Sequence, residues 1–135
     1  MKRQLSMPVW CVRSTCGDPF GGSVMDSITS LEAMDILCEA KKEGLIDFTS
    51  THDDDIVSWD PMNPMDDQDP SSDCYKTIHA LKEKMDKVGL KMKMVTCSLH
   101  GDKLFRNGGL TNPDPEIRAL AAQKVMRTLR IGNFF

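Results

Sequence analysis

The chain has 135 residues, of which 40% are hydrophobic and 27% charged, with a formal net charge of -3 at pH 7. This length and composition predict one ordinary globular domain and exclude a chain that is disordered overall. The acidic balance argues against a nucleic-acid partner, and no apolar run approaches the roughly 18 residues of a membrane span. Met1-Lys2-Arg3-Gln4 leads into no hydrophobic signal region, so we expect a cytoplasmic protein without a membrane partner.

Three strands alternate with three helices in the predicted secondary structure. We expect strands at Met7–Val12, at about Leu45–Ser50 and at Lys91–Leu99. The helices are expected from the capping-box pair Thr29 and Glu32 to Gly44, from Tyr75 to Gly89 (an amphipathic helix), and from Asp114 to Gly132. Loops are expected at 16–23, at Asp53–Ser72, which is long and polar, and at His100–Asn112. On the last helix, Ile117, Ala121, Val125 and Leu129 predict the buried face.

This βα-βα-βα order predicts parallel strands joined by right-handed crossovers, which is an α/β fold. A parallel sheet of three strands leaves its edges unpaired and one face poorly covered. We therefore expect residues 1–135 to be the N-terminal part of a (β/α)8 TIM-barrel-type fold, with only its first three βα units.

A cluster of polar residues stands where the second predicted strand ends. Thr51-His52-Asp53-Asp54-Asp55 delivers one imidazole and three carboxylates to the end of the sheet at which α/β folds bind ligands. His52 and Asp55 are spaced to form a pair in which the carboxylate holds one ring nitrogen and leaves the other for a substrate. The alternative interpretation is that these Asp residues only cap the next helix or solvate a loop.

The cysteines predict neither a zinc site nor a redox motif. Five are present, and none of them forms a Cys-x-x-Cys pair. We expect free thiols.

Four segments together carry a family signal over roughly Val9 to Thr128. They are Trp10, Asp18-Pro19-Phe20-Gly21, Phe48-Thr49-Ser50-Thr51-His52-Asp53-Asp54-Asp55, and Phe105-Arg106-Asn107-Gly108-Gly109-Leu110-Thr111. The third resembles a Phe-His-Asp-Asp-Asp signature, with Thr51 directly before the His, and the fourth a Phe-Lys-Asp-Gly-Gly-Phe-Thr loop. In this order and spacing the chain resembles the N-terminal portion of the shorter class of xylose isomerase, a metal-dependent aldose–ketose isomerase.

The resemblance implies roles for five residues. His52 would hydrogen-bond the sugar and assist ring opening, and Asp55 would hold its imidazole in the useful tautomer. Trp10, on the first predicted strand, would form an apolar wall beside the sugar, and Thr96 would lie on the substrate side of the third strand. Phe20 would reach into the site of a neighbouring subunit, which implies a homo-oligomer with an aldose sugar as substrate.

The resemblance also implies metal chemistry and shows two departures. The family uses Mg²⁺ or Mn²⁺, but its metal ligands and catalytic Lys lie on later strands, so we assign no metal to this chain and expect none at Asp53–Asp55. Ser14 replaces a second Trp of the family, and His100 replaces an aromatic wall residue.

Three hypotheses follow for the function. The first is an aldose–ketose isomerase, converting D-xylose to D-xylulose, of which this chain is an N-terminal fragment that is inactive alone. The second is a non-catalytic remnant that acts as a self-associating or interaction module. The third is a sugar-phosphate isomerase or a DNA-repair endonuclease barrel. An endonuclease of this kind should show a basic face and metal-binding His residues on several strands, and the sequence shows neither.

Overall fold

The computed structural model describes residues 3–13 and 26–135, and it contains a small parallel sheet. Strands β1 (Ser6–Pro8), β2 (Phe48–His52) and β3 (Lys91–Thr96) are hydrogen-bonded in the order β1-β2-β3, and both pairings are parallel. The prediction of an α/β fold with parallel strands is therefore confirmed. No strand among the described residues pairs with the free edge of β1 or of β3, so the barrel closure stays a prediction.

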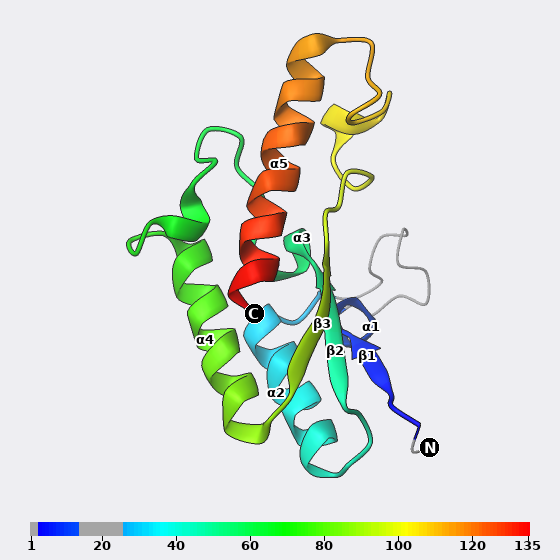
Figure 1. The fold of residues 1–135 in the computed structure, drawn as a ribbon, viewed down its shortest axis with the longest axis vertical. Coiled ribbons are helices and arrows are strands. Elements are labelled where there is room, and N and C mark those ends of the chain that lie inside the picture. The colour runs from blue at the N-terminus through cyan, green and yellow to red at the C-terminus, as the bar shows by residue number, and fades with distance from the viewer. Residues whose placement is uncertain (1–2, 14–25) are drawn as a thin grey trace.

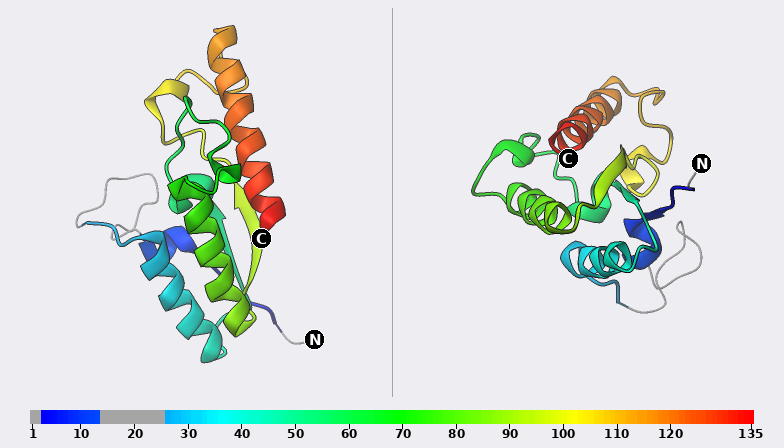
Figure 2. Two further views of the ribbon diagram at one scale, coloured as in Figure 1. Left: turned by 90° about the vertical axis from the view of Figure 1, so that its left-hand side faces the viewer. Right: turned by 60° about the horizontal axis from the view of Figure 1, so that its bottom comes forward.

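Three long helices pack on one side of this sheet (Figures 1 and 2). They are α2 (Ser30–Lys42), α4 (Asp73–Val88) and α5 (Pro115–Phe134). The main core lies between them and the sheet, and its buried residues include Met34 and Leu37 of α2, Ile78 and Leu81 of α4, and Ile131 of α5. No helix in the described ranges is long and apolar enough to cross a bilayer.

Local end signals predict the boundaries of α2 and α4 well. Thr29 Oγ1 accepts a hydrogen bond from the Glu32 backbone, and the Glu32 carboxylate accepts one from the Thr29 backbone at 2.8 Å, as a capping box requires. The hydrogen bonds from Thr29 lower the pKa of Glu32. Gly44 and Gly89 follow their helices with φ of 72° and 69°, the left-handed conformation that glycine adopts without strain.

The first strand is shorter than predicted, because Val9–Arg13 forms helix α1. Val9 is buried and Val12 packs against the same core, whereas Cys11 is exposed. This i, i+3 spacing suits a helical turn and not the alternation of a strand. Trp10 therefore lies on α1 and not on a strand, which corrects the predicted position of its side chain.

The other two strands also end at different residues from those predicted. β2 begins at Phe48 and not at Leu45, because Leu45 is exposed while the polar residues Thr49, Ser50 and Thr51 fill the buried strand. β3 ends at Thr96 and not at Leu99. The apolar content that marked Leu45 as strand is thus a weaker guide than β-branching at Thr49 and Thr51.

The two long connections contain short helices that the sequence did not predict. Helix α3 (Asp53–Ile56) follows β2 directly, and the 3₁₀ helices η1 (Asp66–Gln68) and η2 (Lys103–Phe105) lie in the two loops. Asp53–Asp55 are therefore the first residues of a helix and not of an open loop.

Helix α5 differs from its prediction in length and in its buried face. It continues through Gly132 to Phe134, and a Cβ added at Gly132 would meet Val95 of β3 at an ordinary van der Waals distance. Leu129, predicted to be buried, is 62% exposed. The buried face instead carries Ala121, Lys124, Arg127, Thr128 and Ile131.

Candidate functional site

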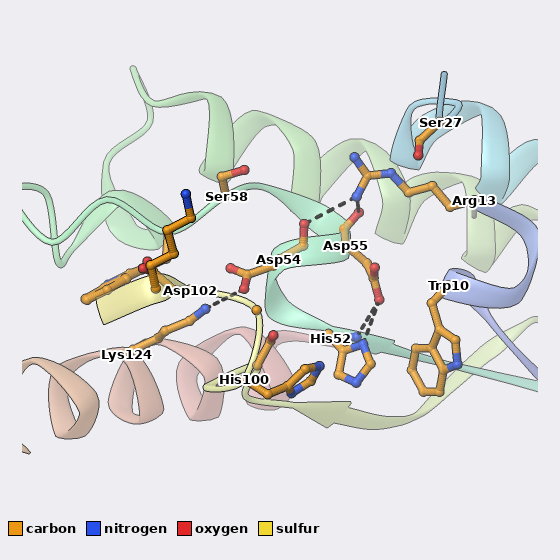
Figure 3. Close-up of a pocket in the computed structure, with 14 residues that line it drawn as sticks. Trp10, Arg13, Ser27, His52, Asp54, Asp55, Ser58, His100, Asp102 and Lys124 are labelled. Atoms are coloured by element: carbon orange, nitrogen blue, oxygen red, sulfur yellow. Dashed lines mark hydrogen bonds and ion pairs between the residues drawn. The ribbon is translucent and has the colours of Figure 1, made fainter. Parts of the chain in front are cut away.

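An open pocket of about 770 Å³ lies at the carboxyl ends of β2 and β3. Its wall is made by Trp10, Arg13, Ser27, His52, Asp54, Asp55, Ser58, Trp59, Ser98, His100, Gly101, Asp102, Lys103 and Lys124 (Figure 3). Both tryptophans of the chain line it. Pockets of this size with a few convergent polar groups are the usual form of small-molecule sites.

Asp55 holds His52 by two contacts from one carboxylate oxygen. Asp55 Oδ2 accepts the His52 backbone N–H at 3.0 Å and lies 3.2 Å from His52 Nδ1. An ionised carboxylate only accepts hydrogen bonds, so Nδ1 carries the proton and Nε2 of the neutral ring is the acceptor. The predicted pair is therefore formed at the end of β2, and the same carboxylate also closes the first turn of α3.

Aromatic rings flank His52 on two sides. The Trp10 ring lies over it with centroids 4.3 Å apart and a tilt of 30°, and the His100 ring meets it edge-on at 5.7 Å. The three rings form a row along one wall of the pocket (Figure 3). His52 is thus restrained by packing as well as by Asp55.

The other end of the pocket contains a buried lysine from α5 (Figure 3). Lys124 Nζ lies 2.6 Å from Asp54 Oδ2 and 3.2 Å from Asp53 Oδ2, and its side chain is only 1% exposed. Asp53 Oδ1 accepts the Ser98 backbone N–H at 2.8 Å, which fixes the chain just after β3. The amino group of Lys124 also lies over the Trp59 ring, 5.6 Å from its centroid.

Two arginines of α5 form ion pairs with the long loop between α3 and α4. Arg127 is buried and makes a bidentate pair with Asp66 at 2.6 and 2.9 Å, and Arg130 makes one with Asp67 at 2.7 and 2.6 Å. Burial opposes the charge of Arg127, but the hydrogen bonds and charges of its anionic partners outweigh it and raise the pKa of the guanidinium. These pairs explain why α5 buries charged residues on a face predicted to be apolar.

Several pocket residues were not predicted from the sequence. Arg13 donates from Nη1 to the Asp54 and Asp55 carbonyls at 3.3 and 2.9 Å, and from Nε to the Ile28 carbonyl, so it joins α1 to α3. Lys124 and Trp59 were also missed. The sequence did contain a signal for Lys124. It is spaced three or four residues from Ala121 and Thr128, on the face of α5 that is buried, and a buried lysine needs an anionic partner.

Not every predicted site residue reaches the pocket. Thr96 pairs with His52 across the sheet, but its hydroxyl donates to the Thr51 carbonyl at 3.3 Å and it does not line the pocket. Its role as a substrate residue stays a prediction. Phe20, the Asp18–Gly21 motif around it and Ser14 lie outside the described residues.

The carboxylates near the pocket do not suit a divalent cation. Among residues 3–13 and 26–135, no group of three or more His, Cys, Asp or Glu is arranged to hold a metal ion. Asp53, Asp54 and Asp55 point to different partners: the Ser98 amide, Lys124 and His52. A cation at Asp53 or Asp54 would have to displace an ammonium group.

No family model matches the chain. It is 28% identical over 131 residues to the xylose isomerase of Thermus thermophilus, and 28% identical over 131 residues to that of Thermus caldophilus. Each match covers 97% of this chain but only 31% of the relative, so the chain spans about a third of the length of these curated proteins. This similarity supports a xylose isomerase-like relationship for the chain.

Proposed function

We propose that the chain is the N-terminal portion of a xylose isomerase-like aldose–ketose isomerase, and that its pocket binds an aldose sugar. The observation that carries the proposal is the His52–Asp55 pair, stacked on Trp10 in a pocket at the carboxyl ends of parallel strands. The similarity to two xylose isomerases over 97% of the chain supports the same substrate class.

Ring opening is the step that these residues would assist. With Nδ1–H held by Asp55, His52 Nε2 accepts the proton of the sugar's anomeric hydroxyl as C1=O1 forms and the bond from C1 to the ring oxygen breaks. The imidazolium then returns this proton to the former ring oxygen, which leaves the open-chain aldehyde and a neutral His52. The Trp10 indole excludes water from one face of the imidazole and gives the sugar an apolar surface.

The later isomerisation step needs parts that the described residues lack. No strand within residues 3–13 and 26–135 pairs with the outer edge of β3, and this supports continuation into a (β/α)8 barrel, because exposed sheet edges are normally paired or covered. The family's Mg²⁺ or Mn²⁺ would polarise the carbonyl once bound. Because the described carboxylates do not fit such an ion, the proposal places its ligands outside them.

A second candidate function is a non-catalytic, self-associating module. Met94 on β3 and Met126 and Leu129 on α5 are exposed by 46%, 56% and 62%, at the edge strand and the helix beside it. Apolar surface of this kind favours contact with a second copy of the chain, which also suits the predicted homo-oligomer.

Anomer exchange of D-xylose tests the ring-opening proposal without any metal. Interconversion of the α and β anomers requires ring opening, and the anomeric proton signals report its rate by NMR. We expect the purified chain to accelerate exchange about 10²–10⁴-fold over buffer at the same pH, which is the usual contribution of a positioned acid–base group.

Two histidine variants give the comparison. His52→Ala should abolish the acceleration, whereas His79→Ala should keep it. His79 of α4 packs between Tyr75 of the same helix and Phe134 of α5, and it does not line the pocket. Equal rates for the wild type and a folded His52→Ala variant would refute the proposed role of His52.

A further inference from the structure

The pocket has a second polar end that ring opening at His52 does not use. Asp54 is one-third exposed to the pocket, and its Oδ2 is bound to Lys124, but its Oδ1 has no partner among the described residues. Trp59 lines the same end and is 9% exposed, and its buried Nε1–H has no acceptor within the described ranges. One acceptor and one donor therefore stand unused on the same wall.

Charges of both signs stand at this end of the pocket, three carboxylates against two lysines, which limits the class of ligand. Lys124 is already neutralised by Asp53 and Asp54, and Asp102 and Lys103 add one charge of each sign to the pocket rim. An anion would meet the Asp54 carboxylate, and a cation would meet the Lys124 ammonium group. An uncharged hydroxyl group suits both Asp54 and Lys124, because it donates a hydrogen bond to a carboxylate and accepts one from an ammonium group.

The size of the pocket allows more than one sugar unit. Its volume of about 770 Å³ lies in the upper part of the range of roughly 300–1,000 Å³ typical of sites for drug-sized ligands. A single pentose at His52 is much smaller than such a ligand. Figure 3 shows the Asp54–Lys124 pair on the side of His52 away from Trp10.

We infer that Asp54 and Lys124 form a second subsite, which binds the hydroxyls of a second sugar unit attached to the aldose at His52. This rests on the proposed function for the position of the first unit. The second unit donates a hydroxyl proton to Asp54 Oδ1 and accepts a hydrogen bond from Lys124, and it packs beside Trp59. The ligand class is therefore a short neutral oligosaccharide with a free reducing end.

The two tryptophans allow each subsite to be observed separately. In the full chain labelled with 5-fluorotryptophan, Trp10 and Trp59 give two ¹⁹F NMR signals, which a Trp59→Phe variant assigns. We expect D-xylose to shift the Trp10 signal alone, and xylobiose to shift both signals with about tenfold tighter binding, as two ordinary hydrogen bonds provide.

Asp54→Asn tests the second subsite. Asn keeps the shape of the side chain and removes the charged acceptor, and Lys124 keeps Asp53 as a partner. We expect this variant to bind xylobiose only as tightly as xylose, with xylose binding unchanged. Asp60→Asn is the matched control, because Asp60 lies nearby in the chain but outside the pocket wall.

Two results with Asp54→Asn, shown by circular dichroism to be folded, would overturn the inference: an unchanged preference for xylobiose, or an equal loss of affinity for both sugars. In the wild type, a shift of the Trp59 ¹⁹F signal by inorganic phosphate, in competition with xylobiose, would also overturn it. Failure of the proposed function looks different: xylose affinity would then be the same in the wild type and in His52→Ala.

Discussion

His52 depends on a single neighbouring oxygen for both its position and its tautomer. Asp55 Oδ2 contacts the ring and the backbone of the same residue, so local helix geometry and the chemistry of the imidazole are coupled. The three-residue spacing made this pair predictable from the sequence. The Trp10 contact was not predictable in its geometry, because α1 replaces the expected strand.

Replacement of Asp55 by Asn should separate the two roles. The amide oxygen still accepts the His52 backbone N–H, so we expect the unfolding free energy to change by about 1 kcal/mol or less. Asn carries no charge to stabilise the imidazolium that forms as Nε2 takes the proton, and a loss of about 1.5–3 kcal/mol in that step should slow anomer exchange about 10–150-fold. Urea denaturation and NMR exchange rates measure the two effects, and a loss of stability without a loss of rate would assign Asp55 to the fold alone.

Cys74 is a buried thiol whose ionisation should limit stability at alkaline pH. Burial raises its pKa from 9.0 to about 11, although Arg127 Nη2 lies 3.2 Å from Sγ and favours the thiolate. A group with a raised pKa in the folded chain contributes stability that is complete below pH 9 and is lost as the pH rises towards 11. At pH 10 the loss should be about 1 kcal/mol.

Denaturation at pH 7 and pH 10 compares the wild type with Cys74→Ala. The variant should be less stable at pH 7 because of the cavity, but it should lose about 1 kcal/mol less on going to pH 10. Parallel losses in both proteins would show that Cys74 does not titrate in this range.

Among the elements, α5 is the one whose role changed most from its prediction. Its capping residue Asp114 and its Pro115 start are local signals, and Asp114 does accept from the Glu116 backbone. Its buried face depends instead on partners about 60–70 residues away, and no local pattern contains them. For the same reason α2 and α4, with local caps, were predicted well, while the ends of the strands were not.

The Arg127–Asp66 pair should be the most sensitive point of α5. Arg127→Met leaves Asp66 buried without a partner, and removal of one member of a buried pair costs about 3–5 kcal/mol. Lys82→Met, which breaks the exposed pair with Asp86 on α4, should cost under about 1 kcal/mol. Urea unfolding curves measure both, and equal small losses would show that the loop is held by other contacts.

A repair experiment separates charge from packing at this position. Adding Asp66→Asn to Arg127→Met removes the unpaired charge, so part of the lost stability should return. No recovery would point to the packing of the Arg127 stem as the main contribution.

As a whole, the described part of the molecule is a sheet with helices on one side and with outer edges, at β1 and β3, that no other described strand pairs. The α/β class and the parallel order followed from the alternation of strand and helix patterns, which are properties of the chain itself. The proposed barrel closure and self-association would depend instead on surfaces that meet other segments or other copies. Met94, Met126 and Leu129 are exposed, and we propose that they form such a surface.

Self-association through α5 can be measured directly. We expect the wild type to sediment as more than one copy, with a weight-average mass that falls on dilution, because apolar contacts between copies are lost by mass action. Replacing Met126 and Leu129 together by Lys should shift the protein to single copies. Met62→Lys, at a site that is 88% exposed in the long loop, is the control. A wild type that is monomeric at every concentration would exclude this surface as a self-association interface.

The separation in sequence of the pocket's two ends determines when each one forms during synthesis. The His52–Asp55 contact spans three residues, whereas Lys124 reaches Asp54 across 70 and Arg127 reaches Asp66 across 61. Contacts between residues this far apart form late, and a nascent chain cannot make them before α5 has left the ribosome. Until then, Asp54 lacks its lysine partner, and Asp66 and Asp67 lack their arginine partners. The chain therefore passes through a stage in which His52 and Asp55 are close together while the end of the pocket formed by Asp54 and Lys124 is not yet assembled.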